Sequence, residues 1–392
     1  MHPPDPSRAS AGMKVAYFTE SLFPLVDGVS RTLAQLFTTL GERGVDFTVF
    51  SPFVPGPEVE WSRRVRKVPF VRFPLYPDYR MSLPYARGVS AALDEFRPAL
   101  VHVVSPTPVG SWAQRLAAKR GLPVVSSFHT HFVSYFRYYG FPALEGAGWE
   151  LMRRFYARCQ KVYAPSYSII HELAEHGIRN TELWSRGIEL DRFSPAFRDP
   201  ALRAAAGAAD EDTPILLLVS RLVKEKDLAD LVAMDGILRA RGVRFRLALV
   251  GDGPMREELQ TLLPHAHFAG HQGGEALSRW YASGDVFVFP STTETFGNVI
   301  QEAHASGLPA VVVDRGGPQD LVEPGVTGEI ARSNDPEDLA DRVEPLLRDA
   351  ALRRRMGAAG RERSAGRTWS AINGRLIDSY AAVIAAHRRG GA

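Results

Sequence analysis

Two glutamates, Glu294 and Glu302, stand eight positions apart in the segment TTETFGNVIQEAHASG. Paired carboxylates are the acid/base groups of glycoside hydrolases, where they lie about 5 to 9.5 Å apart across a sugar ring. On one continuous helix, a separation of eight residues would span roughly 12 Å at about 1.5 Å per residue. The spacing therefore disfavours a hydrolytic pair and suggests that the two acids hold different parts of one ligand.

The residues between the two acids favour a phosphate. The strand-like run DVFVFP leads into STTETFGNV, and a helix is predicted to begin at Gly297 or Asn298 and to continue to about Ser306. Amide groups at the start of a helix attract anions. Glu294 precedes that start and Glu302 follows it. This order matches the hexose, diphosphate and ribose of a nucleotide sugar.

Two cations follow another predicted strand, ILLLV, at residues 215–219. Arg221 and Lys226 would lie at the carboxyl end of that strand, where open α/β sheets bind their ligands. An arginine fork and a lysine point charge together suit a diphosphate. A solvated basic loop is the alternative interpretation.

Two glycine turns also lie between predicted strands and helices. Gly251 in LVGDGP would let a ring or a ribose lie against the backbone, or would simply form a tight turn before Pro254. Gly28 in SLFPLVDGVSRT precedes a predicted helix, where it suits an anion or forms only a turn. Neither turn has the G-x-G-x-x-G pattern, which disfavours a nicotinamide enzyme.

Two histidines, His129 and His131, follow the predicted strand 123–127. No nearby cysteine or carboxylate completes a metal-ligand set, so a polar contact from one histidine is favoured over a metal. Histidines satisfied by the backbone of a loop are the alternative. The DED segment at residues 210–212 resembles a metal-binding D-x-D, but it lies in a predicted linker and is interpreted as a solvated loop.

Short apolar runs alternate with helical patterns, which predicts βαβ units and a parallel sheet. The alternation occurs twice, on either side of a segment rich in proline, alanine and acidic residues at 195–213. The predicted strands are 14–18, 46–50, 99–104, 123–127, 161–164, 215–219, 245–250, 285–289 and 309–313. Predicted helices include 29–44 and others beginning near 227, 254, 274, 297, 316 and 335. Two α/β halves joined in this way would form a cleft suited to a ligand.

Length and charge restrict the class of protein. The 392 residues are 45% hydrophobic, which favours two domains of roughly 150 to 200 residues. A net charge of +3 argues against general nucleic-acid binding. The single cysteine fits a reducing compartment, and no signal-like or membrane-spanning run is present. We therefore expect a cytoplasmic protein that binds no nucleic acid.

Several motifs together resemble the family 4 retaining glycosyltransferases, which have the GT-B fold. They are SRLVKEK, VGDGP, ETFGNVIQE, ASGLP and GGP, and the resemblance extends from about residue 14 to 390. RGIELDRF, at residues 186–193, is similar to the inter-domain signature, with Arg186 where many members have asparagine. FHTH and this Arg-Gly variant are most similar to the branch of lipid mannosyltransferases and sulfoquinovosyl-lipid synthases.

The resemblance implies an α/β protein with two Rossmann-like doubly wound parallel-sheet domains facing a central cleft. We expect a disordered tail at residues 1–12 and an N-terminal acceptor-binding domain at 13–195. A C-terminal nucleotide-sugar-binding domain is expected at 196–370. The last helix, at 371–392, is expected to cross back to the first domain.

The resemblance also implies roles for single residues. Arg221 and Lys226 would bind the diphosphate and stabilise its departure. Glu302 would bind the ribose, and Glu294 and His129 would bind the hexose. The implied catalytic set is His129, Glu294, Arg221 and Lys226, and the implied donor-binding set is Gly28, Gly251, Phe296, Gly297, Asn298, Val299 and Glu302. No metal or other cofactor is implied, because cations and helix amides would replace it electrostatically. Retention would follow from front-face attack, with the acceptor proton passing to the leaving phosphate.

The expected activity is transfer of a hexose, mannose from GDP-mannose in the first instance, to a lipid or glycolipid. A UDP-sugar donor for glucosyl, N-acetylglucosaminyl or sulfoquinovosyl transfer is the nearest alternative, because nothing in the turns separates guanine from uracil. A non-catalytic nucleotide-sugar-binding module would be expected to lose Glu294, Lys226 or Arg221. A sugar-nucleotide epimerase of the same fold would form product without an acceptor.

The acceptor side has two further candidate segments. WSRRVRKVPFVRFPLYPDYR, residues 61–80, mixes aromatic residues with cations, namely Arg63, Arg64, Arg66, Lys67, Arg72 and Arg80. That composition suits an anionic membrane surface and a peripheral position at the inner face, while its prolines exclude one continuous helix. A solvated basic face is the alternative. SYFRYYGF, residues 134–141, would line an acceptor pocket or pack in the core.

Overall fold

The computed structural model describes residues 12–25, 27–73, 76–131, 133, 142–210 and 212–390. The predicted tail, apart from Gly12, and the aromatic segment 134–141 lie outside these residues. The described chain falls into two compact units. The N-terminal unit runs to Arg186 and resumes at Trp369, and the C-terminal unit is Gly187–Thr368. These limits replace the divisions expected after residues 195 and 370.

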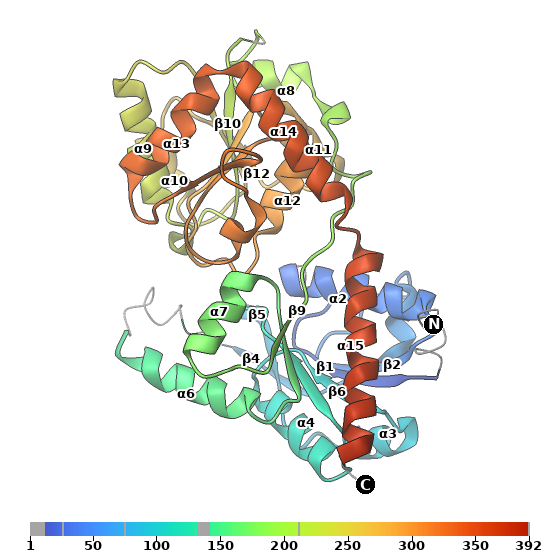
Figure 1. The fold of residues 1–392 in the computed structure, drawn as a ribbon. Helices are drawn as coiled ribbons and strands as arrows, with labels where there is room; N and C mark the ends of the chain where they lie inside the picture. Colours follow the sequence, from blue (N-terminus) through green and yellow to red (C-terminus); the bar gives the residue numbers. More distant parts are fainter. Residues whose placement is uncertain are drawn as a thin grey trace, which may run out of the picture. The chain divides into compact units, whose positions relative to one another are not determined.

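The N-terminal unit is built on a seven-stranded, fully parallel sheet in the order β3-β2-β1-β6-β7-β8-β9. Its strands are β1 (Lys14–Phe18), β2 (Asp46–Ser51), β3 (Val65–Lys67), β6 (Leu100–Val103), β7 (Val124–Ser127), β8 (Lys161–Ala164) and β9 (Thr181–Leu183). Its helices include α2 (Gly28–Glu42), α3 (Val89–Phe96), α4 (Pro108–Ala118), α6 (Glu145–Tyr156) and α7 (Tyr167–Glu175). Successive residues of β1 are buried, as expected for a parallel strand covered on both faces. Figure 1 shows the strands and helices of this unit.

Helix α2 illustrates how the sequence sets an element. Asp27 accepts a hydrogen bond from the Ser30 amide, and the Ser30 side chain accepts one from the Asp27 amide, which forms a capping box. Leu33, Leu36, Phe37 and Leu40 then recur on one buried face, with the spacing typical of an amphipathic helix.

The basic stretch 61–80 forms no long helix. It contributes to a 3₁₀ turn, η1 (Glu60–Arg64), to β3, and to an antiparallel hairpin of β4 (Phe70–Phe73) and β5 (Tyr76–Ser82). The described part of the stretch therefore agrees with the expectation from its prolines, since proline is incompatible with a helix interior.

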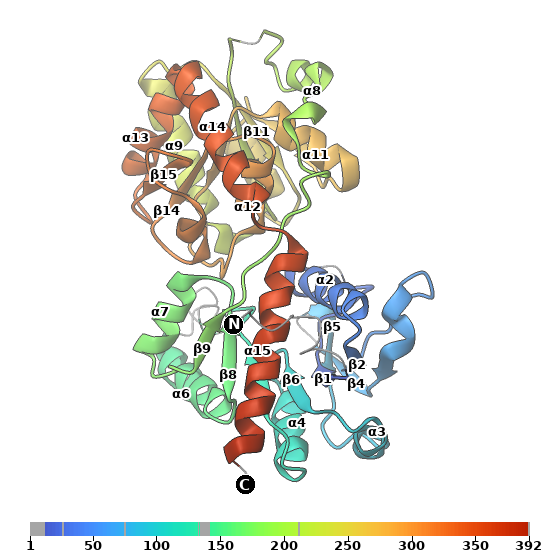
Figure 2. The ribbon, with the colours of Figure 1, turned by 45° about the vertical axis from the view of Figure 1, so that its right-hand side comes forward.

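The last helix, α15 (Trp369–Gly390), packs on the sheet of the N-terminal unit. Its Tyr380 hydroxyl lies 2.6 Å from His102 Nδ1 and 3.3 Å from the Tyr17 hydroxyl. The Tyr163 hydroxyl donates to Ser379 Oγ at 2.9 Å. All these groups are buried, so the helix is fixed by a polar network as well as by apolar contacts. Figure 2 shows α15 running along the strands of this unit.

The C-terminal unit repeats the plan with a six-stranded parallel sheet in the order β12-β11-β10-β13-β14-β15. The strands are β10 (Ile215–Val219), β11 (Arg246–Val250), β12 (His267–Gly270), β13 (Val286–Phe289), β14 (Ala310–Val313) and β15 (Gly328–Ala331). Its helices include α8 (Pro200–Ala205), α9 (Leu228–Ala240), α10 (Arg256–Leu262), α11 (Gly274–Ser283), α12 (Asn298–Ala305), α13 (Pro336–Arg348) and α14 (Ala350–Ala365). The strand order reverses between β10 and β13, which makes this a doubly wound sheet.

The segment predicted as a linker, 195–213, is folded into the C-terminal unit. Arg203 in α8 is 2% exposed and donates to Asp285 at 2.7 Å. Asp285 also accepts a hydrogen bond from the Ile215 amide at the start of β10. The segment therefore contains a buried ion pair that connects it to the central strands, which its alanine-rich composition did not indicate.

Every predicted strand is confirmed to within a residue or two. The strands absent from the prediction within the parallel sheets, β3, β9, β12 and β15, are the edge strands of the two sheets. Edge strands are short and carry charged or small residues, so they lack the continuous apolar run of a central strand. The helix predicted near residue 316 is a 3₁₀ turn, η5 (Gly317–Leu321).

One carboxyl group follows β1 inside the N-terminal core. Glu20 is 2% exposed, and no described residue makes a hydrogen bond of standard geometry to either carboxyl oxygen. Burial raises the pKa of Glu20 from 4.5 to about 8, against a smaller opposing effect of the Thr107 hydroxyl. Glu20 is therefore protonated at neutral pH.

The raised pKa of Glu20 predicts a pH-dependent stability. The folded protein binds this proton more tightly than the unfolded chain, so the free energy of unfolding falls as pH rises from about 4.5 to about 8, by about 1.4 kcal/mol per pH unit. Glu20→Gln removes that slope. Urea unfolding of both proteins at pH 5 and at pH 8.5 measures the difference, and the exposed Glu42→Gln serves as control. Parallel pH profiles for wild type and Glu20→Gln would contradict the prediction.

Candidate functional site

Three candidate residues of the C-terminal unit lie at the carboxyl ends of β10 and β13. These neighbouring strands mark the reversal of strand order, where open α/β sheets bind their ligands. Arg221 and Lys226 follow β10, and Glu294 follows β13. The topology thus brings together groups that are far apart in sequence.

The loops after β10 and β13 are joined by hydrogen bonds. Asp227 Oδ2 accepts from the Thr292 amide and from the Thr292 hydroxyl, each at 2.8 Å. The Thr293 hydroxyl donates to the carbonyl of Glu225 at 2.9 Å. This pairing holds the STTETFG segment against the turn that carries Lys226.

Lys226 and Glu294 form an ion pair through Nζ and Oε1. Lys226 is only 8% exposed, so the interpretation of this lysine as part of a solvated loop is wrong. A lysine buried to this extent is stabilised by its charged partner. Arg221 differs, because its side chain is 66% exposed and its ion pair with Glu225 is long, at 3.9 Å. Arg221 therefore extends into solvent at this edge of the sheet.

The Gly-Gly-Pro segment supports the loop of Glu294. The Gly317 amide donates to the Glu294 carbonyl at 2.8 Å. A Cβ added to Gly316 would lie 2.5 Å from the same carbonyl oxygen, and one added to Gly317 would lie 2.3 Å from the Thr295 oxygen. Since contacts this short are forbidden, these glycines are required for the two backbones to touch.

Helix α12 begins at Asn298, as predicted, with Gly297 as its N-cap in the left-handed region at φ 97°. No side chain caps this end, and Phe296 anchors it in the core at 5% exposure. Asn298 and Val299 in the first turn are half-buried. An uncapped helix start next to Lys226 and Glu294 provides amide donors for an anion.

Glu302 has a different partner from Glu294. The Tyr281 hydroxyl in α11 donates to Glu302 Oε2 at 2.7 Å. The two glutamates of the opening motif are therefore held separately, one by a lysine and one by a tyrosine. Sequence reasoning missed Tyr281, because an aromatic residue in an amphipathic helix indicates only core packing.

Gly251 has a packing role in the structure. Its φ is 141°, and an added Cβ would lie 1.8 Å from the Ser220 carbonyl oxygen. The Gly251 amide donates to the Gly270 carbonyl at 2.8 Å. The glycine thus allows the GDGP turn to pack against the segment that leads to Arg221, and a contact with a ribose or ring is a proposal beyond this.

In the N-terminal unit, His129 follows β7 and contacts Arg186. The His129 Nδ1 and Arg186 Nη2 atoms lie 2.8 Å apart. Because a guanidinium can only donate, Nδ1 accepts this bond and the ring proton is on Nε2. Burial, and then the charge of Arg186, lower the pKa of His129 well below its usual value. His129 is therefore a neutral imidazole whose Nε2–H group is buried.

Arg186 is the partner that sequence reasoning missed, although its departure from the usual asparagine was noticed. It is 4% exposed and donates to the Trp184 carbonyl at 2.8 Å. Burial lowers the pKa of Arg186 to about 9. The ring of Trp184 also packs edge-on against His129, with centroids 5.4 Å apart. Together these contacts orient the imidazole.

The remaining metal-like motifs have ordinary partners. His131 Nε2 lies 2.8 Å from Glu172 Oε1, so the two histidines of FHTH contact different groups. Asp210 accepts from the amide and the hydroxyl of Thr213, at 2.7 and 3.1 Å, and forms a capped turn. Across the described ranges, no three His, Cys, Asp or Glu side chains are arranged to hold a metal ion.

Gly28 is exposed at the start of α2. The neighbouring Asp27 carboxylate already caps this end and also accepts from the Ser21 hydroxyl at 2.7 Å. A capping carboxylate carries the same sign of charge as a phosphate. The capping carboxylate therefore disfavours a phosphate at this end of α2.

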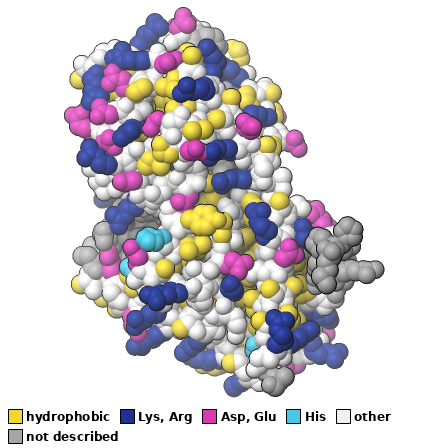
Figure 3. Space-filling model, viewed as in Figure 1, with side chains coloured by type: hydrophobic (Ala, Val, Ile, Leu, Met, Phe, Trp, Pro, Cys, Tyr) yellow, Lys and Arg dark blue, Asp and Glu magenta, His cyan; other side chains and the backbone are white. Residues whose placement is uncertain are grey.

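The basic stretch is only partly available for an anionic surface. Arg64 pairs with Asp46, and Arg66 lies 3.4 Å from Glu95. Arg80 stacks over the rings of Phe53 and Phe70. Arg63 and Lys67 are exposed. On the face in view in Figure 3, cations and acids are interspersed over each unit. Within the described residues, no helix has both the length and the apolar character needed to cross a bilayer.

Two family models match the chain. The model described as Glycosyltransferase Family 4 covers residues 26–192, and that described as Glycosyl transferases group 1 covers residues 203–363. Together they span most of both units.

Curated relatives align over nearly the whole chain. A GDP-mannose-dependent alpha-mannosyltransferase of Mycolicibacterium smegmatis is 36% identical and covers 95% of this chain and 98% of its own length. One from Corynebacterium glutamicum is 33% identical, with coverage of 96% and 91%. The sulfoquinovosyl transferase SQD2 of Arabidopsis thaliana is 31% identical, with coverage of 97% and 76%.

Solved structures share the fold. Sucrose-phosphate synthase from Thermosynechococcus elongatus has a TM-score of 0.75 at 23% identity, covering 95% of this chain and 100% of that chain. Anabaena HepE in complex with UDP has a TM-score of 0.75 at 19% identity, covering 94% and 100%. The family models, the identities above 30% and the shared fold lead to one conclusion: the chain belongs to glycosyltransferase family 4 and is a glycosyltransferase with the GT-B fold.

Proposed function

We propose that this glycosyltransferase transfers mannose from GDP-mannose to a lipid or glycolipid acceptor, with retention and without a metal. The observation that carries the site is the buried Lys226–Glu294 ion pair beside the uncapped start of α12. The donor rests on the relatives of 33 to 36% identity, which are named GDP-mannose-dependent alpha-mannosyltransferases. The lipid acceptor is supported by the relative named alpha-monoglucosyldiacylglycerol synthase and by the phosphatidylinositol mannoside mannosyltransferase.

The donor diphosphate would bind at the start of α12. Lys226 and Arg221 would supply positive charge, and the amides of the first turn of α12 would supply hydrogen-bond donors. Fixed charges and amides cost no reorganisation as negative charge develops on the leaving group. They would therefore stabilise the departing nucleoside diphosphate without a divalent cation.

The two glutamates would bind opposite ends of the donor. Glu302 is held by the hydrogen bond from Tyr281, and its carboxylate would accept hydrogen bonds from the ribose hydroxyls. Glu294 is fixed by Lys226 and by the Gly317 amide on its carbonyl, and it would accept hydrogen bonds from the hexose. Two rigid acceptors with an anion site between them suit the binding of a nucleotide sugar better than they suit the role of a hydrolytic acid/base pair.

His129 would orient the hexose as a donor and not as a base. Its lowered pKa keeps the ring neutral, and Arg186 bonds to Nδ1, so the Nε2–H group, which is buried in this structure, is the one that would contact the hexose. The proton of the attacking acceptor hydroxyl would pass to the leaving phosphate on the same face of the sugar, which gives retention. No side chain is then needed as a covalent nucleophile.

A UDP-sugar donor is the second candidate. SQD2 is a sulfoquinovosyl transferase, and HepE was solved with UDP. A non-catalytic module is disfavoured because the chain retains Arg221, Lys226 and Glu294.

The donor is tested by incubating purified protein with a panel of GDP- and UDP-sugars, with and without a lipid acceptor, and measuring nucleoside diphosphate release. We expect release from GDP-mannose to be highest and to survive a chelator. Higher release from a UDP-sugar would replace the donor assignment. Product formed without an acceptor would indicate an epimerase, and activity that is lost with the chelator and restored by a divalent metal would contradict the metal-free proposal.

The ion pair is tested by Glu294→Ala and Lys226→Ala. Each should lower kcat/KM for transfer at least about 100-fold, because each removes a positioning or charge-stabilising group. The control is Lys224→Ala, an exposed lysine in the same turn, which should transfer at the wild-type rate. Near-normal transfer by both site variants would reject the site, provided that urea unfolding shows them to be folded.

Membrane contact through the basic stretch is tested with vesicles containing anionic lipid. Replacing Arg63, Arg64, Arg66 and Lys67 by glutamine should weaken binding at least about tenfold, since each unpaired cation contributes about 1 kcal/mol near such a surface. The matched control, Arg354→Gln with Arg355→Gln, removes exposed cations from the C-terminal unit and should leave binding unchanged. Equal vesicle binding by wild type and the fourfold variant would reject this surface.

A further inference from the structure

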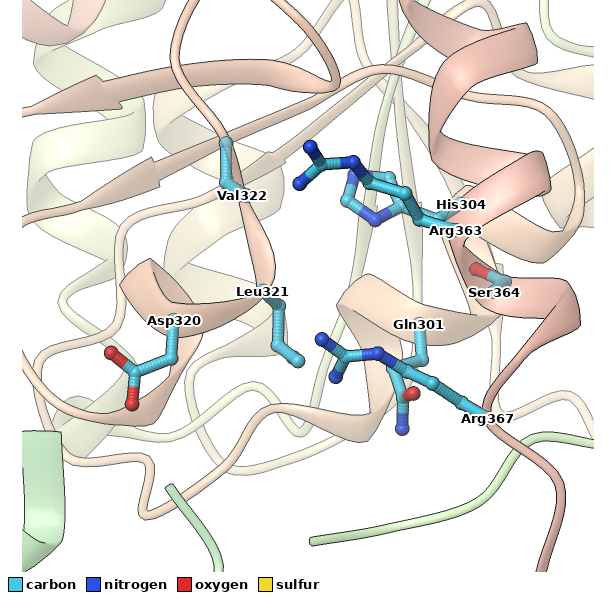
Figure 4. A pocket seen from close by; sticks show the side chains of 8 residues that line it. All are labelled: Gln301, His304, Asp320, Leu321, Val322, Arg363, Ser364 and Arg367. Carbon is cyan, nitrogen blue, oxygen red and sulfur yellow. The ribbon is translucent and has the colours of Figure 1, made fainter. Parts of the chain in front are cut away.

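The C-terminal unit contains a small cavity that the donor site does not use. Its volume is about 60 Å³, and it is lined by Gln301, His304, Asp320, Leu321, Val322, Arg363, Ser364 and Arg367 (Figure 4). Gln301 and His304 are three residues apart and share one face of α12, whereas Glu302 on the same helix bonds to Tyr281. At roughly 10–15 Å³ for one water, the cavity has room for several waters or one tetrahedral oxyanion.

Two arginines project into this cavity from the same side. Figure 4 shows the guanidinium groups of Arg363 and Arg367 directed across it, while the Asp320 carboxylate points away. Burial and then the charge of Arg363 lower the pKa of Arg367, against a smaller opposing effect of the Asp320 carboxylate. Arg363 has one acidic partner, Glu323, at the half-exposed rim. An anion between the guanidinium groups would relieve the repulsion.

His304 adds a buried polar atom to the cavity wall. The residue is 4% exposed, and its Nε2 has no hydrogen-bond partner among the described residues. Buried nitrogen atoms of this kind usually have a partner, so a ligand or water is expected beside it. A hydrogen phosphate group carries both acceptor oxygens and a P–OH donor, and therefore satisfies Nε2 in either tautomer.

Close helix packing fixes the arrangement. A Cβ on Gly360 would lie 2.9 Å from His304 Cδ2, and one on Gly357 would lie 1.9 Å from the Gly307 carbonyl oxygen. These glycines let α14 lie directly on α12, which brings Arg363 and His304 to the same space. The cavity is therefore formed by packed backbone and not by a loop.

We propose that this cavity binds one phosphate group, either inorganic phosphate or the terminal phosphate of a small monoester, through Arg363, Arg367 and His304. The bound group would connect α12, η5 and α14 within the C-terminal unit. The Arg367 carbonyl accepts from the Ile188 amide at 2.9 Å, next to the residues where the chain enters and leaves this unit. A bound phosphate would therefore reduce the motion of the two segments, near Ile188 and Arg367, through which the chain enters and leaves the unit.

The test is a calorimetric titration of the full chain with inorganic phosphate and, separately, with glycerol 3-phosphate. We expect Arg363→Gln with Arg367→Gln to weaken phosphate affinity at least tenfold. Arg221→Gln, at the donor site, and Arg354→Gln with Arg355→Gln, exposed on α14, should retain the cavity's affinity. Tighter binding of glycerol 3-phosphate would identify a monoester as the ligand, and tighter binding of inorganic phosphate would identify the free ion.

If the double variant fails to unfold cooperatively, Arg367→Lys replaces it. That variant keeps the charge but loses the two-pronged geometry of the guanidinium, and should still bind phosphate more weakly than wild type. Undetectable binding to wild type, wild-type affinity in the cavity variants, or loss of all binding in Arg221→Gln would overturn the proposal.

Discussion

The carboxyl ends of neighbouring parallel strands lie at the same edge of a sheet, and the candidate donor site depends on that constraint. In the C-terminal unit, β10 and β13 are hydrogen-bonded neighbours although a strand pair and several helices separate them in sequence. Their carboxyl ends bring Lys226 next to Glu294 across 68 positions of chain. The hydrogen bonds from Thr292 to Asp227 then fix the two loops to each other. Ligand groups can be this precise only because the sheet below them is rigid.

Glycines in the sequence motifs of the C-terminal unit serve contacts between loops. Gly251 touches the Ser220 carbonyl, and Gly316 and Gly317 touch the ETFG backbone. None of these backbones could approach so closely with a side chain between them. Gly251, Gly316 and Gly317 therefore hold together the loops that carry Arg221 and Glu294.

The sequence predicted the central strands and the start of α12, because these depend on local apolar runs and on helix signals. It did not predict the partners of the site residues. Tyr281 meets Glu302, and Arg186 meets His129, only after the chain has folded. It also could not indicate that Arg64 and Arg66 are paired with acids, since Asp46 and Glu95 lie on other elements. The sequence shows which charged residues are present, but it does not show which of them form ion pairs.

The docking of α15 has a consequence for synthesis. Residues of the C-terminal unit leave the ribosome before α15 does, so that unit has its whole chain available first. The N-terminal unit must wait, because His102 and Tyr17 obtain their partner Tyr380 only from the last helix. Until then the apolar surface that α15 covers, which includes Phe37 and Leu40, stays open to water or to a chaperone. The N-terminal unit is thus the first to be synthesised and the last to complete its fold.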